Sequence, residues 1–168
     1  GLAMIGGDLS FSSGGYHGTP VARVLPVRLL PPAGDPSRLV SSEDFRPRLT
    51  RQGRDHPILQ LGRSSQETRQ LLRALPRLTG VNLVAGPAPG ATVLAEHPRL
   101  RTRRGKRMPV LAVGASGKGR ALALTTDTSW HWAFLSVGQG GTRQGYDRLW
   151  RNAIRWLIKD PALKYLRV

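Results

Sequence analysis

The sequence predicts one domain of the α/β class, and three patterns support this prediction. The apolar run Leu2–Ile5 ends in a glycine-rich segment, as a buried strand does at the binding edge of an α/β sheet. Residues 109–113 and 120–126 are apolar runs on either side of a glycine-rich turn, which is typical of a β-hairpin. From residue 146 onward, apolar side chains recur with helical spacing. At 168 residues and with no internal repeat, the chain suits a single domain, 1–168.

The first third of the chain predicts only short elements. Thr19 followed by Pro20 indicates one capped helical turn over residues 19–24. Four prolines between positions 26 and 36 exclude a long regular element there. The remaining elements predicted in this region are a short strand at 27–30, an edge strand at 45–51 and a helical segment at 55–59.

The rest of the chain predicts longer elements. Ser64, followed three residues later by Glu67, indicates a capped helix that ends before Pro76. The other elements are strands at 81–85 and 91–95, joined by a turn, and a helix at 146–159. Because the first strand starts almost at residue 1 and needs a partner, we expect N-terminal strands of the same sheet to precede this sequence in a longer protein.

Positive charge is the strongest compositional bias. The chain has 26 Lys and Arg residues against 10 Asp and Glu residues, a formal net charge of +16. Such a balance raises nucleic acid, anionic membranes and acidic proteins as partners. One dense basic run comprises Arg99, Arg101, Arg103, Arg104, Lys106 and Arg107. Aromatic residues make up 6% of the chain and none interleaves with this run, so we favour a solvated basic surface over nucleic-acid binding.

Composition also excludes several kinds of site. The sequence has no cysteine, so it has no disulfide, no thiolate metal site and no cysteine nucleophile. No run reaches the roughly 18 apolar residues of a membrane span, and the first residues lack a signal-peptide pattern. The histidines are far apart and form no ligand pair with helical spacing. They are His17, His56, His97 and His131. We therefore expect no metal and no cofactor, and expect turn roles for His56 and His97, which each precede a proline.

The glycines and lysine of residues 114–119 do not form a phosphate-binding loop. That loop requires glycine at position 112 and serine or threonine at position 119, where this chain has alanine and glycine. A hairpin turn accounts for these glycines.

Residues 126–132 are the best candidate for a ligand site. They follow a predicted strand, so their polar side chains and two indoles would lie at the edge of the sheet where open α/β folds bind ligands. We favour the simpler interpretation that Asp127 or Ser129 caps a helix and that the indoles pack. If both interpretations hold, this segment and the glycine-rich loop form one cleft. The residues that we expect to line it are Asp8, Ser10, Tyr16, His17, Asp127, Trp130 and His131.

Several unusual pieces occur in a distinctive order along the chain. They are Gly6-Gly7, Ser10-Phe11, Gly14-Gly15-Tyr16, Thr19-Pro20, His56-Pro57, and residues 109–112, 117–120, 126–132 and 150–157. Together they resemble the bacterial family named "putative glutamine amidotransferase". The resemblance covers nearly the whole chain and extends to trehalose-utilisation-type proteins. It implies a flavodoxin-like, class I glutamine amidotransferase-like sheet with flanking helices. It also implies that the chain is the C-terminal part of a larger protein. In this family the larger proteins are often anchored in the bacterial inner membrane and carry a von Willebrand factor A domain.

The resemblance does not bring the chemistry of the family's name. A class I glutamine amidotransferase places a nucleophilic cysteine on a sharp turn after a strand, and here that turn is Gly6-Gly7. We therefore expect a noncatalytic domain that senses a small-molecule ligand or binds other domains or subunits of a larger envelope-associated protein.

Two alternatives remain open. The first is a cysteine-independent hydrolase that uses the serines of loop 6–18 and the segment 127–132, although the loop lacks the Gly-x-Ser-x-Gly pattern of a serine nucleophile. The second is a module that binds nucleic acid or anionic surfaces through the basic run and the basic side of the predicted helix 146–159.

Overall fold

The computed structural model describes residues 1–138 and 140–161, and it confirms the predicted α/β class. The main sheet has five strands in the order β1-β9-β8-β7-β4. Their bounds are β1 Leu2–Ile5, β4 Arg48–Leu49, β7 Thr92–Arg101, β8 Arg107–Ser116 and β9 Gly119–Leu124. Two antiparallel ribbons accompany this sheet: β2 (Val27–Arg28) with β6 (Gly86–Pro87), and β3 (Val40–Phe45) with β5 (Leu78–Asn82).

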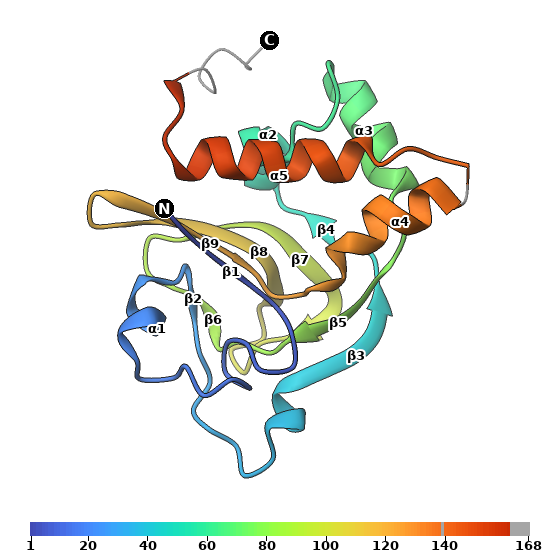
Figure 1. Cartoon of the computed structure of the whole chain (residues 1–168). Coiled ribbons are helices and arrows are strands. Elements are labelled where there is room, and N and C mark those ends of the chain that lie inside the picture. Colours follow the sequence, from blue (N-terminus) through green and yellow to red (C-terminus); the bar gives the residue numbers. More distant parts are fainter. Residues whose placement is uncertain (139, 162–168) are drawn as a thin grey trace.

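Helices flank the β structure on two sides. Figure 1 shows α2, α3, α4 and α5 together on one side and α1 on the other. The helices are α1 Pro20–Val24, α2 Arg51–Asp55, α3 Ser65–Ala74, α4 His131–Gly138 and α5 Gln144–Leu157, and the 3₁₀ turns are η1 Pro36–Leu39, η2 Pro57–Leu59 and η3 Thr128–Trp130. Among the residues described, no helix combines the length and apolar character needed to cross a membrane.

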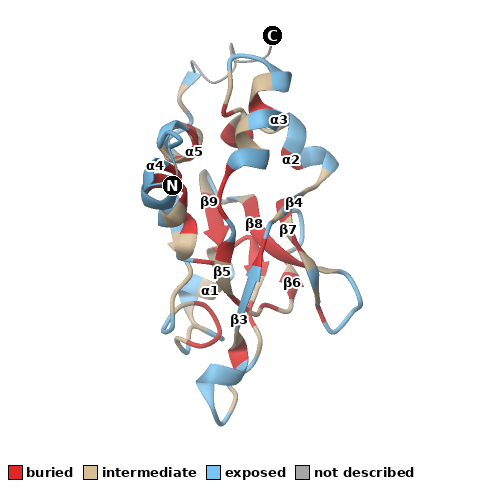
Figure 2. Ribbon diagram, turned by 90° about the vertical axis from the view of Figure 1, so that its right-hand side faces the viewer, coloured by how far each residue is buried: buried red, intermediate tan, exposed pale blue. Residues whose placement is uncertain are grey.

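The sheet buries apolar side chains on both faces, and Figure 2 shows the buried residues concentrated in its strands. Side chains alternate between faces along a strand, so Leu122 and Leu124 of β9 belong to one core cluster and Ala123 belongs to the other. The first cluster includes Trp132 and Leu149 from the helical side. The second includes Phe11 from the glycine-rich segment. Burial on both faces explains why β8 and β9 read as continuous apolar runs in the sequence.

Parallel pairing in the described sheet is confined to one pair of strands. β1 runs parallel to β9, with Leu2 opposite Ala121 and Ile5 opposite Leu124. The other strand pairs that the structure describes are antiparallel. The carboxyl ends of β1 and β9 therefore lie side by side, and the segments that follow them start at the same edge of the sheet.

The edge strand predicted at 45–51 is wrong in its bounds. β3 already ends at Phe45, β4 consists of two residues after Pro47, and residues 51–55 form α2. Proline lacks the N–H that a continuous strand needs, and Thr50 caps the new helix by accepting a hydrogen bond from Gly53 N at 2.9 Å. A Cβ at Gly53 would lie 1.9 Å from Leu94 O, so this helix approaches β7 closely only because residue 53 is glycine.

The strands predicted at 81–85 and 91–95 are also displaced. β5 ends at Asn82, and β7 continues through His97-Pro98 to Arg101. The ring of His97 makes this continuation work because its Nδ1 accepts hydrogen bonds from Arg99 N at 3.2 Å and Leu100 N at 2.9 Å. The register of β7 against β8 shifts here, which marks a bulge rather than the turn that His97 was expected to form.

Other elements agree with the sequence. Thr19 caps α1, and Ser64 caps α3 by accepting a hydrogen bond from Glu67 N at 3.1 Å. The β8–β9 hairpin forms as predicted, with Gly117 at φ 53° in its turn. His56 has the expected turn role, because its Nδ1 accepts a hydrogen bond from Ile58 N at the start of η2.

Candidate functional site

The glycine-rich segment turns sharply where β1 ends. Gly6 N donates a hydrogen bond to Leu124 O at 2.8 Å, which continues the pairing of β1 with β9 by one residue. A Cβ at Gly6 would lie 2.7 Å from the N, Cα and C atoms of Thr126, closer than real Cβ contacts. Glycine is therefore required at position 6, because the chain after β1 passes close to the backbone of the segment after β9.

Asn82, at the end of β5, fastens this turn. Its Oδ1 accepts a hydrogen bond from Gly7 N at 3.1 Å, and its Nδ2 donates to Gly7 O at 2.9 Å and to Ser13 Oγ at 3.0 Å. Its backbone N donates to Thr125 O at 2.7 Å. The side chain is buried, with 2% of the residue's surface exposed. Sequence reasoning missed Asn82, and the available signal was an amide residue inside the otherwise apolar run 81–85.

These contacts create a cleft of about 200 Å³ at the carboxyl ends of β1 and β9. Its lining is Gly7, Asp8, Val40, Ser41, Ser42, Thr79, Gly80, Val81, Asn82, Thr125, Thr126 and Asp127. Two acidic residues, one asparagine and several serines and threonines thus line a common space, and no lysine or arginine is among the lining residues. The cleft lies where open α/β sheets bind ligands.

The two carboxylates of the cleft have no partner within the part of the chain that the structure describes. Asp127 occupies the N-cap position of η3, yet its side chain makes no capping hydrogen bond. Thr126 Oγ1 instead accepts a hydrogen bond from Thr128 N at 3.4 Å, and Thr128 Oγ1 bonds with both Thr79 N and Thr79 O at 2.9 Å. Asp8 is exposed at the start of the glycine-rich loop. Both acids are therefore available to a ligand.

The serines of the glycine-rich loop are part of its scaffold. Ser12 Oγ donates to Leu83 O at 3.2 Å and accepts from Leu30 N at 2.9 Å, and Ser13 Oγ donates to Ser10 O at 2.7 Å. Ser12 and Ser13 are buried. His17 is exposed, and no Ser–His hydrogen bond exists among residues 1–138 and 140–161. The described geometry assembles no serine nucleophile with its base.

The aromatic residues expected at the cleft lie elsewhere. Tyr16 packs against the core cluster around Phe11. Trp130 is 46% exposed and makes an edge contact with His131 at 4.2 Å between ring centroids. His131 Nδ1 lies 3.4 Å from Arg77 O. The structure thus brings Asp8 and Asp127 to one cleft. Ser10 is not among the lining residues, but its carbonyl oxygen accepts a hydrogen bond from Asn82 Nδ2 at 3.3 Å.

Trp132 is packed in the core, but not under the glycine-rich loop as we expected for one of the two indoles, because it belongs to the core cluster on the helical side and Phe11 of the loop belongs to the other. It is 6% exposed, and its Nε1 donates a hydrogen bond to Pro76 O at 3.0 Å. It therefore anchors α4 to the segment between α3 and β5.

Two histidines lie away from the cleft, His97 fully buried and His56 partly buried. His56 contacts Trp156 of α5 at 5.6 Å between centroids, and burial lowers the pKa of His56 to about 4, with a further contribution from the positive charge of Arg120. Burial likewise lowers the pKa of His97, whose ring packs on Phe45 at 4.3 Å. No group of three or more His, Cys, Asp or Glu residues in the described ranges is arranged to hold a metal ion.

The basic run occupies the β7–β8 hairpin. Arg99 forms an ion pair with Glu43 at 2.9 Å, Arg101 Nη1 donates to Gly105 O at 2.9 Å, and Arg107 Nη1 donates to Pro98 O. The other three members, Arg103, Arg104 and Lys106, are exposed around the turn. The hairpin does not contribute to the cleft lining.

Comparisons with known proteins agree with this architecture. Residues 1–159 match the family described as "Putative glutamine amidotransferase". No curated protein matches the chain.

Two solved structures are similar in fold. Cytoplasmic Protein STM3548 from Salmonella typhimurium is 23% identical, with a TM-score of 0.64 over 93% of this chain and 54% of that chain. Cytoplasmic Protein STM1381 from Salmonella typhimurium LT2 is 24% identical, with a TM-score of 0.63 over the same shares, 93% and 54%. The chain therefore spans about half the length of these two proteins.

Proposed function

This chain belongs to the family described as putative glutamine amidotransferases, and from that premise we propose that it is a noncatalytic domain of a larger protein that senses a small polar ligand in the cleft of Asp8 and Asp127. Two observations together carry the proposal: one cleft holds two carboxylates that have no partner among the described residues, and the sequence has no cysteine. The resemblance to envelope-associated proteins is the basis for placing the parent protein at the bacterial membrane.

The lack of a nucleophile supports the noncatalytic half of the proposal. Amide hydrolysis by this class of fold needs a thiolate, and the chain has none. The hydroxyls of Ser12 and Ser13 are buried in hydrogen bonds with the loop and its neighbours. A hydrolase would have to break these bonds before either oxygen could attack a substrate. The hydrolase alternative is therefore less well supported than ligand binding.

The chemistry of the cleft indicates the class of ligand. Carboxylates accept hydrogen bonds and attract positive charge, and no basic residue lines the cleft to balance Asp8 and Asp127. Hydroxyl groups from Ser41 and Ser42 add donors and acceptors, whereas the Thr79 hydroxyl already donates to Asp44 Oδ1 at 2.7 Å. An amine or a polyhydroxylated molecule fits this set better than an anion does.

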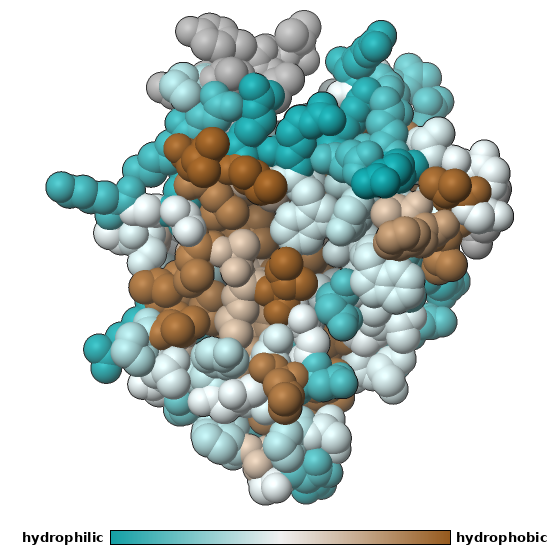
Figure 3. Space-filling model, in the orientation of Figure 1, coloured by the Kyte–Doolittle hydropathy of each residue, from teal (hydrophilic) through white to brown (hydrophobic). Residues whose placement is uncertain are grey.

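A second observation favours a docking role for β1. In the described sheet, β1 pairs on one side only, with β9. Figure 3 shows apolar side chains gathered over β1, α1 and the C-terminal end of α5. The exposed apolar residues of these elements are Leu2, Ile5, Val21 and Ile154, and Ile158 follows α5. We propose that another part of the parent protein adds a strand to β1 and covers this face.

Ligand sensing can be tested by thermal unfolding of wild type, Asp127→Asn and Asp55→Asn. Asp55 is an exposed acid at the end of α2, outside the cleft lining, and its variant controls for the loss of one negative charge. The panel contains polyamines, amino acids, sugars and polyols. We expect at least one compound to raise the Tm of wild type and of Asp55→Asn, with the shift lost in Asp127→Asn, because a ligand that binds the folded state stabilises it. No shift with any compound, or equal shifts in both variants, would contradict ligand sensing in this cleft.

A further inference from the structure

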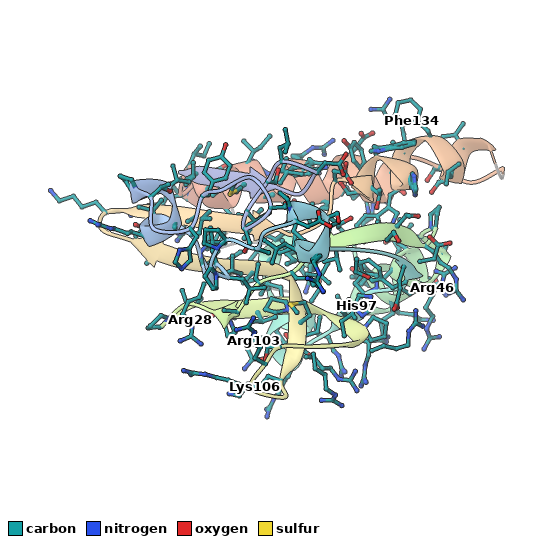
Figure 4. All side chains as sticks on the ribbon, turned by 90° about the horizontal axis from the view of Figure 1, so that it is seen from below. Arg28, Arg46, His97, Arg103, Lys106 and Phe134 are labelled. Carbon is teal, nitrogen blue, oxygen red and sulfur yellow. The ribbon has the colours of Figure 1, made fainter. Side chains whose placement is uncertain are left out.

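A second concave site lies between the β2–β6 ribbon and the β7–β8 hairpin. Its volume is about 220 Å³, and its lining includes Arg28, Gly86, Thr102, Arg104 and Lys106. None of its lining residues belongs to the cleft of Asp8 and Asp127. Figure 4 shows Arg28 and Lys106 on the same side of the molecule, with Arg103 beside them on the hairpin. This basic pocket is therefore separate from the proposed sensing site.

Arg28 is the central feature of the basic pocket. It lies on β2 opposite Gly86 of β6. Its Nε is buried and has no hydrogen-bond partner, and its side chain makes no hydrogen bond or ion pair with the residues that the structure describes. Proteins rarely leave a buried donor unpaired, and a charged donor least of all. Among the described residues this guanidinium Nε therefore lacks an acceptor, which a bound anion would supply.

Gly86 leaves room above this guanidinium. A Cβ on Gly86 would lie 3.7 Å from Arg28 Nη2 and 3.9 Å from Thr102 Cγ2, so the absent side chain opens the space between them. The φ of Gly86 is +140°, a conformation that other residues rarely adopt. The hydroxyl-bearing Thr102 is buried at the base of the hairpin and completes this wall.

The hairpin turn holds two further cations at the rim. Thr102 N donates to Lys106 O at 2.8 Å, and Gly105 N donates to Thr102 O at 2.9 Å. These bonds fix the turn from which Arg104 and Lys106 project. Glu43, the acid paired with the hairpin, is engaged by Arg99 and does not line the pocket. Three positive charges thus line one concave space that has no acidic side chain among its lining residues.

We propose that this pocket binds the phosphate group of a phosphorylated small molecule. The forked guanidinium of Arg28 matches two phosphate oxygens, and Arg104 and Lys106 neutralise the remaining charge. A doubly charged phosphate group suits three cations better than a single carboxylate does. The concave shape and the walls from the β2–β6 ribbon favour a small molecule over a nucleic-acid backbone, which needs a continuous basic stripe.

Isothermal titration calorimetry with inorganic phosphate and pyrophosphate tests the proposal, using wild type, Arg28→Gln, Lys106→Gln and Arg103→Gln. Arg103 is the matched control because it lies on the same hairpin and carries the same charge but does not line the pocket. We expect wild type to bind pyrophosphate, and Arg28→Gln and Lys106→Gln each to weaken binding by about tenfold or more. Arg103→Gln should change the affinity by less than about twofold, because it removes only screened surface charge. Lys106 is exposed, so Lys106→Gln keeps the test valid if Arg28→Gln does not fold.

Two further titrations separate the possible sources of phosphate. One uses a 20-nucleotide single-stranded DNA, and the other uses vesicles of phosphatidylcholine and phosphatidylglycerol. One result would overturn the proposal in favour of binding by general surface charge. In that result the DNA and the vesicles bind weakly and in a salt-sensitive way, Arg28→Gln and Arg103→Gln reduce this binding equally, and pyrophosphate does not bind. Pyrophosphate binding that is lost equally in all three variants would overturn it as well.

Discussion

Asn82 holds Gly7 through both groups of its side-chain amide: Oδ1 accepts from Gly7 N at 3.1 Å while Nδ2 donates to Gly7 O at 2.9 Å. The two residues are 75 positions apart in the sequence. This two-way contact mimics the hydrogen bonding between two strands. The side-chain amide of Asn82 takes the place that a neighbouring backbone would have beside Gly7. The position of Asp8 in the cleft depends on it, because Asp8 directly follows Gly7.

We expect Asn82→Ala to lower the free energy of unfolding by about 2–3 kcal/mol, because the partly buried Gly7 N–H and the buried Ser13 hydroxyl would each lose a hydrogen-bond partner. Urea unfolding of the purified chain measures this loss. Ser42→Ala is the control, since Ser42 is exposed in the same cleft and its loss should change stability by less than about 0.5 kcal/mol. Equal stability of Asn82→Ala and wild type would show that the loop does not need this fastening.

Gly6→Ala should destabilise the fold by about 2 kcal/mol or more. Its Cβ would meet three backbone atoms of Thr126 at 2.7 Å, and backbone cannot move aside as a flexible side chain can. Gly34→Ala provides the comparison, because a Cβ there meets nothing within 4 Å. Thermal or urea unfolding of both variants measures the loss of stability that each substitution causes. A tolerated Gly6→Ala with an unchanged cleft would contradict the close approach of β1 to the segment after β9.

The partly buried ring of His56 predicts a stability that depends on pH. Its pKa is about 4 in the folded chain against an ordinary histidine value of 6.5, so the unfolded chain binds a proton more readily. The stabilisation is complete above about pH 6.5 and is lost as the pH falls from there toward 4, by at most about 3 kcal/mol. His56→Asn keeps an acceptor for Ile58 N but cannot titrate. The difference in unfolding free energy between wild type and His56→Asn should shrink by this amount between pH 7 and pH 4, and a constant difference would refute the prediction.

The purified chain should release no more ammonia from glutamine than buffer does. The reason is chemical: the sequence lacks cysteine, and Ser12 and Ser13 are engaged in buried hydrogen bonds. A coupled ammonia assay with millimolar glutamine measures this. Turnover that persists through repurification and disappears in Ser10→Ala would instead support the hydrolase alternative.

Local signals in the sequence predicted the elements that depend on local contacts. Ser64 and Glu67 mark the start of α3 because capping involves residues three apart. The apolar positions of α5 repeat with the helical period, and the structure places Leu149 and Ala153 in the core. The glycines of the β8–β9 turn likewise act within a few residues.

The misplaced elements depend on partners that are distant in the sequence. His97 keeps β7 extended through a proline by accepting two N–H bonds, which no propensity for the His-Pro pair predicts. In the cleft, Asp8 and Asp127 were anticipated from their places after two strands, whereas Ser41 and Thr79 come from the β3–β5 ribbon, whose pairing the pattern did not indicate. Tyr16 and Trp130 were expected at the cleft because they are near it in sequence, but their rings follow the packing of their own segments.

The pairing of β1 with β9 has a consequence for the order of folding. Leu2 lies opposite Ala121, so this pair closes a loop that contains most of the chain, whereas β8 and β9 meet across a turn of two residues. Closing a long loop costs more chain entropy than closing a short one. The β7–β8–β9 meander can therefore form early, and β1 docks late, once Thr125 and Asn82 are in place to receive the loop that follows it. The cleft of Asp8 and Asp127 would then be among the last parts of the molecule to assemble and among the first to open, so a molecule bound there would hold β1 in place.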